Sequence, residues 1–296
     1  MIWKTRINQM TGTKYPVVMG AFMGLGLTEF AAAFSNAGGL GIISALNYPK
    51  TEIFKEQLVK MKELTDKPFG VNFSVIPQNF RNFVGSALSN DDYLKLVEVA
   101  INEGVKIFTT SVFKANFIGE RVHEAGAYWF HKCVLLRHVP SVIDAGVDAI
   151  TLSGMEGSGF KNPYQHTTLT NITIAKKWFD VPLIAAGGIG DARGFLGALG
   201  MGAEAVCFGT AILATEESPA NIRMKANWLE TDIKSEEYFK NIYHFSLRSS
   251  NVPSTAIAHQ KKIVPIKEFI EGVMNEAEKI LHSWGFTANE FNTIPT

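Results

Sequence analysis

The sequence predicts an α/β protein, a (β/α)8 or TIM barrel with additional C-terminal helices. Short apolar runs alternate with helical segments, which is the pattern of a parallel sheet built from βα units. Eight such runs occur, and this number favours a closed barrel over an open doubly wound sheet. A chain of 296 residues, 46% of them apolar, is long enough to bury a core of that size.

The eight predicted strands are short and apolar, and several are rich in β-branched residues, as strands buried on both faces usually are. Helix-capping residues lie between them. Thr28 is expected to cap the helix 29–37, and Asn90 or Asp91 to cap the helix 92–102. The predicted strands cover residues 17–19, 40–43, 69–73, 105–108, 127–130, 149–152, 183–185 and 205–208.

The chain is expected to divide after the eighth strand. The barrel would cover residues 1–214, and a helical extension over 215–296 would pack on it. A polar connector over 246–255 interrupts this extension and lies either near the barrel mouth or on the plain surface. Helices are predicted in the extension over residues 219–232, 235–243 and 266–284.

The charge balance favours small-molecule chemistry. The chain has 28 basic and 28 acidic residues, so its formal net charge is zero and nothing points to nucleic acid or an anionic membrane. The chain has two cysteines, Cys133 and Cys207, and both fall in predicted buried strands. This usage is typical of a protein from a reducing compartment, and neither cysteine belongs to a metal motif. The sequence has no signal-peptide run and no stretch of roughly 20 apolar residues. We therefore expect a cytoplasmic protein without membrane or nucleic-acid partners, and a homo-oligomer stays open.

Two late strands end in glycine, and together they predict a phosphate site. The first runs into Gly187 and Gly188, and the second runs into Gly209 and Thr210. Glycines leave backbone N–H groups uncovered where a phosphate can approach, and barrels commonly bind phosphate after their seventh and eighth strands. Asp191 is expected to cap the helix that follows the first turn.

The remaining site candidates follow from the rule that barrel active sites form at the carboxyl ends of the strands. Asn72 offers a donor and an acceptor to a flat heterocycle, although a structural asparagine is the plain alternative. Lys132 would be costly to bury unpaired, so it faces an anionic or electron-rich ligand unless it reaches solvent. The other candidates at strand ends are Gly20, Ala21, Phe22, His131, Ser153, Gly154, Gly157 and, further along a mouth-side segment, His166.

Several site types find no support in the sequence. No Ser/His/Asp order or metal-ligand spacing stands out, which argues against a hydrolase or a metalloenzyme. The segment from Gly188 to Arg193 lacks the last glycine of a dinucleotide fingerprint and the acidic ribose partner that follows it.

Taken together, these motifs resemble the nitronate monooxygenase family, the FMN-dependent barrels once called 2-nitropropane dioxygenases. That family also includes a flavin-dependent class of enoyl-acyl carrier protein reductases. The resemblance implies FMN across the barrel mouth, with residues 19–22 at its edge and with Asn72 and Lys132 at the polar side of its ring. It also implies a phosphate held by Gly187, Gly188, Gly209 and Thr210, and a ribityl side lined by Ser153, Gly154 and Gly157. The motifs that carry it are 34–41, 70–73, 131–133 with 137–138, 185–189 and 208–210.

One position departs from the family pattern. The family usually has Gly-x-Glu-x-Gly-Gly-His, whose histidine is assigned an acid/base or substrate-orienting role, whereas this chain has Gly154-Met-Glu-Gly-Ser-Gly-Phe160. A phenyl ring cannot transfer a proton. Either the reaction needs no such residue, or another catalytic group replaces it, the candidates being His131, Lys161, Tyr164 and His166.

The leading functional hypothesis is an FMN-dependent oxidoreductase that passes electrons from a small organic substrate to oxygen. The second is an FMN reductase that uses NAD(P)H to reduce an activated alkene, such as an enoyl thioester, or a quinone. A flavin-free isomerase or lyase for a sugar phosphate is a third, because a glycine cradle would serve it equally well. A non-catalytic flavin carrier is the fourth.

Overall fold

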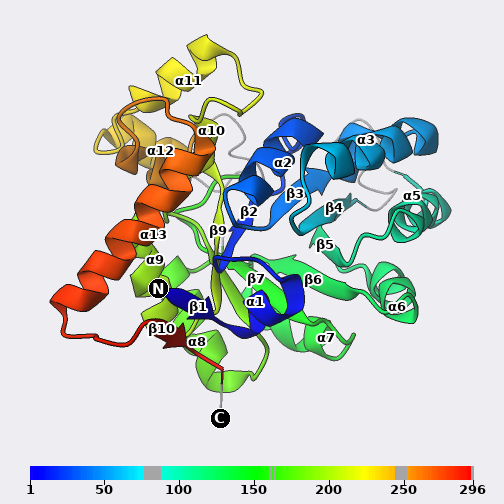
Figure 1. The fold of residues 1–296 in the computed structure, drawn as a ribbon, viewed down its shortest axis with the longest axis horizontal. Coiled ribbons are helices and arrows are strands. Elements are labelled where there is room, and N and C mark those ends of the chain that lie inside the picture. The colour runs from blue at the N-terminus through cyan, green and yellow to red at the C-terminus, as the bar shows by residue number, and fades with distance from the viewer. Residues whose placement is uncertain (77–87, 160–161, 163, 244–251, 295–296) are drawn as a thin grey trace.

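The computed structural model describes residues 1–76, 88–159, 162, 164–243 and 252–294, and it confirms the predicted barrel (Figure 1). Eight parallel strands pair in the order β2-β9-β8-β7-β6-β5-β4-β3. A parallel bridge between Val18 and Leu40 joins β2 to the chain just before β3 and closes the ring. The strands are β2 (Val17–Met19), β3 (Gly41–Ser44), β4 (Phe69–Val75), β5 (Ile107–Val112), β6 (Tyr128–Cys133), β7 (Ala149–Ser153), β8 (Leu183–Ala186) and β9 (Ala205–Phe208).

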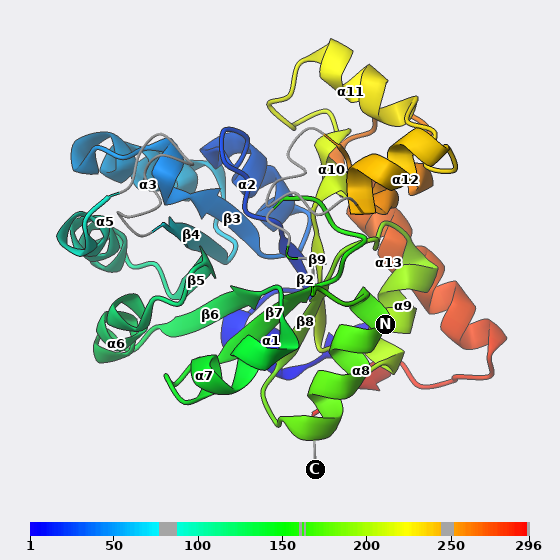
Figure 2. The ribbon, with the colours of Figure 1, turned by 180° about the vertical axis from the view of Figure 1, so that it is seen from behind.

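Helices surround the strands on the outside of the ring (Figure 1, and from behind in Figure 2). Packing is tight where they meet the sheet: a Cβ atom added to Gly119 in α6 would lie 2.3 Å from the ring of Trp129 in β6. The helices between the strands are α2 (Thr28–Asn36), η1 (Ala45–Asn47), α3 (Thr51–Leu64), α5 (Asn90–Asn102), α6 (Asn116–Glu124), η3 (Leu136–His138), α7 (Val139–Ile143), α8 (Thr168–Trp178) and α9 (Ala192–Gly200).

The predicted helix caps were partly wrong. Leu27, not Thr28, occupies the N-cap of α2, and the Thr28 hydroxyl instead donates to Gln57 Oε1 at 2.7 Å. Ser89 caps α5, because its hydroxyl and the Asp92 carboxylate form a reciprocal capping box. The predicted cap of α9 is confirmed, since Asp191 accepts a hydrogen bond from the Gly194 N–H at 2.8 Å.

The C-terminal extension is helical as predicted. After the short α10 (Thr210–Leu213) come α11 (Ile222–Leu229), α12 (Glu236–Tyr243), η4 (Thr255–His259) and α13 (Ile266–Ser283). Helix α13 packs against α9 and α2, and its Phe269 ring lies 5.3 Å from that of Phe208 in β9. The extension thus shares the barrel's apolar core, and its boundary at residue 214 stays a prediction.

The two ends of the chain meet in a feature that sequence analysis missed. Strand β1 (Ile2–Lys4) pairs in parallel with β10 (Glu290–Asn292), and α1 (Arg6–Thr11) follows it across the amino ends of the barrel strands. Among the described residues, no helix is both long and apolar enough to cross a membrane.

Candidate active site

Strand register determines which side chains face the barrel interior. Trp129 packs outward against α6, so alternation along β6 turns Trp129 and His131 outward and Lys132 inward. Lys132 and Cys207 lie on strands that are not neighbours, yet they interact electrostatically, which places both side chains inside the ring. By the same alternation, Asn72 of β4 faces inward, beside its register partner Thr109.

Lys132 forms no hydrogen bond or ion pair with any residue that the structure describes. Burial lowers the pKa of its ammonium group below the ordinary value, while the Cys207 thiol opposes this shift. Burial likewise raises the pKa of Cys207 to about 11, so this thiol is protonated at neutral pH. An unpaired lysine inside a barrel is costly, and a bound anionic or electron-rich group would offset that cost.

Asn72 is largely satisfied by its neighbours. Its Nδ2 donates to Thr109 Oγ1 at 2.9 Å, and its Oδ1 accepts from Ser74 Oγ at 3.0 Å. Ser74 in turn lies 3.0 Å from Ser111 Oγ. The same Nδ2 also donates to the Thr109 carbonyl at 3.3 Å, so both N–H groups have an acceptor. The predicted contact with a ring stays a prediction.

The two glycine turns lie side by side, because Ala186 and Cys207 pair directly in the β8–β9 ladder. Gly187 and Gly188 have φ angles of 104° and 74°, which L side chains rarely adopt. The backbone N–H groups of Gly187, Gly188, Gly209 and Thr210 donate to no acceptor among the described residues. Four unpaired donors at one place fit an anion with several oxygen atoms.

The loop after β7 packs against these two turns, which we call the glycine cradle (Gly187, Gly188, Gly209 and Thr210). A Cβ on Gly157 would lie 3.3 Å from the Gly187 Cα, and Gly154 donates its N–H to the Ala186 carbonyl at 2.8 Å. The Glu156 carboxylate accepts hydrogen bonds from the Thr168 N–H at 2.9 Å and the Thr168 hydroxyl at 3.1 Å. Ser153, Gly154 and Gly157 are therefore brought next to the predicted phosphate site.

The residues that follow β2, the first barrel strand, also lie beside the glycine turns. The Gly20 N–H donates to the Phe208 carbonyl at 2.8 Å, and a Cβ on Gly20 would lie 3.2 Å from the Gly209 Cα. Phe22 folds back so that its ring approaches Gly20 and stacks on Phe30 at 6.2 Å. Gly20 and Phe22 thus lie beside the cradle, while Ala21 is exposed.

None of the proton-transfer candidates that the structure describes lies in the barrel interior. His131 faces the helix layer, where its Nδ1 lies 2.7 Å from the Thr110 hydroxyl. His166 and Tyr164 have exposed side chains, and Arg137 lies 5.6 Å above the Tyr164 ring. Lys161 lies outside the described residues, as does Phe160.

His131 makes the folded state sensitive to acid. Burial, with a smaller effect of the nearby His138 and Lys114 charges, lowers its pKa from 6.5 to about 4. The unfolded chain therefore binds more protons between these pH values, and the free energy of unfolding falls as the pH falls through this window. At pH 5 we expect a loss of about 2 kcal/mol, since one pKa unit corresponds to about 1.4 kcal/mol. Urea unfolding at pH 7 and pH 5 measures it. In His131→Asn, which cannot titrate, an undiminished loss would show that another group is responsible.

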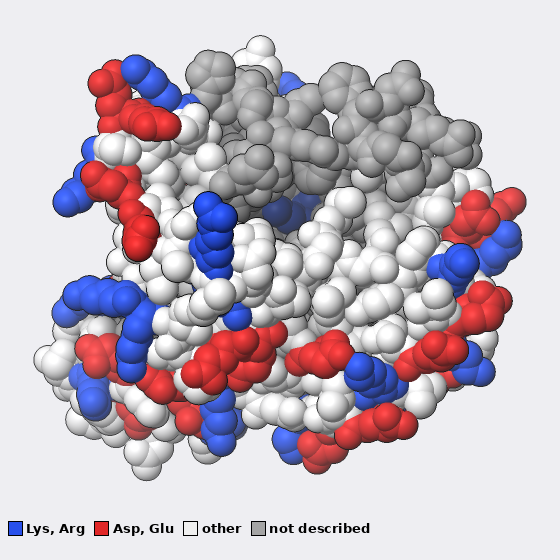
Figure 3. All heavy atoms as spheres, turned by 90° about the horizontal axis from the view of Figure 1, so that it is seen from above, with Lys and Arg blue, Asp and Glu red and all other residues white. Residues whose placement is uncertain are grey.

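Sequence reasoning missed several polar groups at the mouth. Ser74 and Ser111 could have been found by extending the strand alternation beyond Asn72 and its register partner Thr109. Ser254 and Thr255 belong to the connector 246–255, for which the mouth was one of two predicted locations, and the contact of Ser254 with Thr210 brings this end of it there. Residues 246–251 of the connector lie outside the described residues. Among the residues described, no cluster of three potential metal ligands occurs. Seen from above, charged side chains of both signs lie mostly along the left, lower and right edges of the described surface (Figure 3).

Comparison with known proteins agrees with this geometry. The family model described as nitronate monooxygenase matches residues 4–243. The chain belongs to the nitronate monooxygenase family. Curated relatives that match this chain are named as a nitronate monooxygenase and as dehydrogenases, which are oxidoreductase names.

The names of individual relatives describe different activities. A probable nitronate monooxygenase from Staphylococcus aureus is 29% identical over 265 residues, covering 77% of this chain and 74% of the relative. A (3aS,4S,5R,7aS)-5-hydroxy-7a-methyl-1-oxo-octahydro-1H-indene-4-carboxyl-CoA dehydrogenase from Mycobacterium tuberculosis is 31% identical over 231 residues, 78% of this chain. The chain spans 61% of that relative's length and 60% of its Rhodococcus jostii counterpart. The solved structure of FabK from Thermotoga maritima has a TM-score of 0.80 and 25% identity, covering 96% of this chain and 99% of that one.

Proposed function

We propose that this member of the nitronate monooxygenase family binds FMN and oxidises a small organic substrate at the barrel mouth. The observation that carries the proposal is the set of four unpaired amides at Gly187, Gly188, Gly209 and Thr210. Because the chain belongs to the nitronate monooxygenase family, we expect the terminal phosphate of FMN to be the anion that these amides bind. When bound, FMN supplies the redox chemistry, since it accepts electrons from the substrate and passes them to oxygen.

The residues of the chain would bind and orient the cofactor. The glycine amides would hold the phosphate, while Ser153, Gly154 and Gly157 would line the ribityl chain, with Gly20, Ala21 and Phe22 at the edge of the ring. The Lys132 ammonium and the Asn72 carboxamide would contact the polar side of the ring. A positive charge at that position favours the added electrons of the reduced ring.

Phe160 in place of the family histidine is compatible with nitronate oxidation. A nitronate is the conjugate base of a nitroalkane, so its oxidation does not require the enzyme to remove the α-proton. The chain's own candidates, His131, Tyr164 and His166, would then need no acid/base role.

The visible spectrum of the purified protein and an anaerobic titration test this function. We expect a flavin spectrum that is bleached by a nitronate without NAD(P)H. A colourless protein that cannot be reconstituted with FMN would contradict the proposal.

A second candidate function is the NAD(P)H-dependent reduction of an activated alkene such as an enoyl thioester. The carboxyl-CoA dehydrogenases among the relatives favour it, because their names give a CoA thioester as the substrate. Rapid anaerobic bleaching by NAD(P)H, with no response to nitronates, would select it.

Phe160→His provides a separate test of the missing proton-transfer group. If an acid/base group limits a nitroalkane reaction, the variant should raise kcat with the neutral nitroalkane by about 100-fold, the lower range for positioned proton transfer. Activity with the preformed nitronate should hardly change, because that substrate has already lost its proton. Equal effects on both substrates would argue against this role.

A further inference from the structure

The C-terminal extension lies directly across the glycine turns. The Ser254 N–H donates to the Thr210 hydroxyl at 3.1 Å, and the Thr255 N–H donates to the Glu156 carbonyl at 3.3 Å. A Cβ on Gly188 would lie 3.0 Å from Thr255 Oγ1. Four segments therefore meet at the cradle: the loop after β7, the turn after β8, the start of α10 after β9 and the start of η4.

Two hydroxyl hydrogens at this junction have no acceptor in the described part of the chain. Ser158 Oγ and Thr210 Oγ1 lie 3.2 Å apart, so one of their two hydrogens is used between them and the other is left over. Thr210 cannot give its hydrogen to Ser254, because Ser254 is the donor in that contact. The Thr255 hydroxyl makes no hydrogen bond with a described residue.

The neighbouring acidic groups are already engaged elsewhere. Glu156 accepts from the backbone and hydroxyl of Thr168. Asp191 caps α9 and forms an ion pair with His259 at 3.3 Å. The donors left unpaired around the turns are four amides and two hydroxyl hydrogens, and such an array of donors selects an anion that has several oxygen atoms.

We propose that the extension completes the phosphate site, with the Thr255 hydroxyl and the Ser158–Thr210 pair donating to the same phosphate as the glycine amides. This inference rests on the proposed FMN function. It goes beyond it by making the extension a determinant of cofactor choice, because riboflavin lacks the phosphate that these hydroxyls would bind. The chain would discriminate FMN from riboflavin through residues outside the barrel strands and their turns.

Flavin binding to the apoprotein tests the proposal without measuring activity. Dissociation constants for FMN and riboflavin are determined by flavin fluorescence in the wild type, Thr255→Val and Thr255→Ser. Valine has nearly the shape of threonine but no hydroxyl, so we expect FMN binding to weaken about tenfold, as for the loss of a hydrogen bond to a charged group. Riboflavin binding should not change, and serine should restore most of the FMN affinity.

Thr173→Val is the matched control, because the exposed Thr173 hydroxyl bonds only within α8. Ser158→Ala provides a second test should Thr255→Val fail to fold, and it too should weaken FMN alone. Equal losses for both flavins, or no loss for either, would overturn the role of the extension while leaving FMN binding intact. A wild-type protein that binds neither flavin would overturn the proposed function itself.

Discussion

Gly209→Leu is expected to abolish FMN retention at a modest cost in stability, of about 1–3 kcal/mol, from backbone strain. Gly209 has φ and ψ angles of −102° and −106°, a pair outside the broad regions of L residues, so a side chain there adds some backbone strain, although a Cβ would meet no atom within 4 Å. The new side chain would therefore extend into the open space beside the unpaired amides instead of into the core. Overpacking of a filled site costs about 3 kcal/mol, so we expect FMN to bind at least about 100-fold more weakly. The measurements are flavin absorbance after gel filtration and the melting temperature of the apoprotein.

Two other glycines make this experiment specific. Gly188→Val should lose both FMN and stability, because Gly188 has a φ of 74° and its Cβ would lie 3.0 Å from both Glu156 Cβ and Thr255 Oγ1. Gly197→Ala in α9 should affect neither property adversely, since its Cβ meets nothing within 4 Å. Full FMN retention in Gly209→Leu would mean that the phosphate binds elsewhere.

The barrel could be predicted because its strands are buried on both faces and therefore read as apolar runs. The errors occurred where strands carry polar residues. Strand β5 continues through Thr109 to Val112, and β6 continues through His131 and Lys132, beyond the ends predicted for them. These polar residues lie toward the mouth. Their polarity makes them candidates for function, and it also interrupts the apolar pattern from which the strand ends are predicted.

That shift also explains the misplaced histidine. His131 was expected at the end of its strand, where a side chain can turn toward the mouth. Because β6 extends to Cys133, His131 keeps the strand's alternation and points outward to Thr110, while Lys132 points inward. Reading the strand two residues longer would have separated the two side chains.

The glycine turns were predictable because they directly follow strands in the sequence. The segments that contact these turns were not predictable, because they lie far away in the sequence. Gly187, Gly188 and Gly209 follow directly from strands that the sequence makes visible. The contact between Ser254 and Thr210 joins residues 44 positions apart, and β1 pairs with β10 across nearly the whole chain. Three-residue strands and single hydroxyl contacts leave no periodic pattern, so only the folded structure reveals them.

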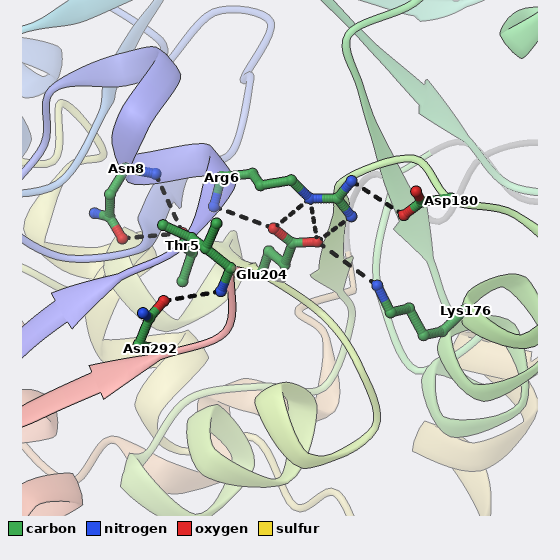
Figure 4. A network of polar contacts seen from close by, with 8 residues as sticks. Thr5, Arg6, Asn8, Lys176, Asp180, Glu204 and Asn292 are labelled. Carbon is green, nitrogen blue, oxygen red and sulfur yellow. Dashed lines mark hydrogen bonds and ion pairs between the residues drawn. The ribbon is translucent and has the colours of Figure 1, made fainter. Parts of the chain in front are cut away.

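Glu204→Gln is expected to lower the free energy of unfolding by about 3 kcal/mol, the lower range for breaking a buried ion pair. Glu204 is only 2% exposed and lies just before β9, at the end of the barrel opposite the mouth. Its carboxylate accepts from the Arg6 backbone N–H at 3.1 Å and from the Arg6 guanidinium, and Lys176 Nζ lies 3.8 Å away (Figure 4). An amide would remove the negative charge and direct N–H donors at these cations.

The matched control is Glu236→Gln in α12, whose partner Lys240 lies at 2.6 Å but on the open surface. Exposed pairs contribute little, so this variant should change stability by less than about 0.5 kcal/mol. Urea unfolding compares the two variants, and FMN affinity should be unaffected in both because neither residue approaches the glycine turns. If Glu204→Gln were as stable as Glu236→Gln, the exposed Asp180, 3.1 Å from Arg6, would be sufficient to balance that guanidinium.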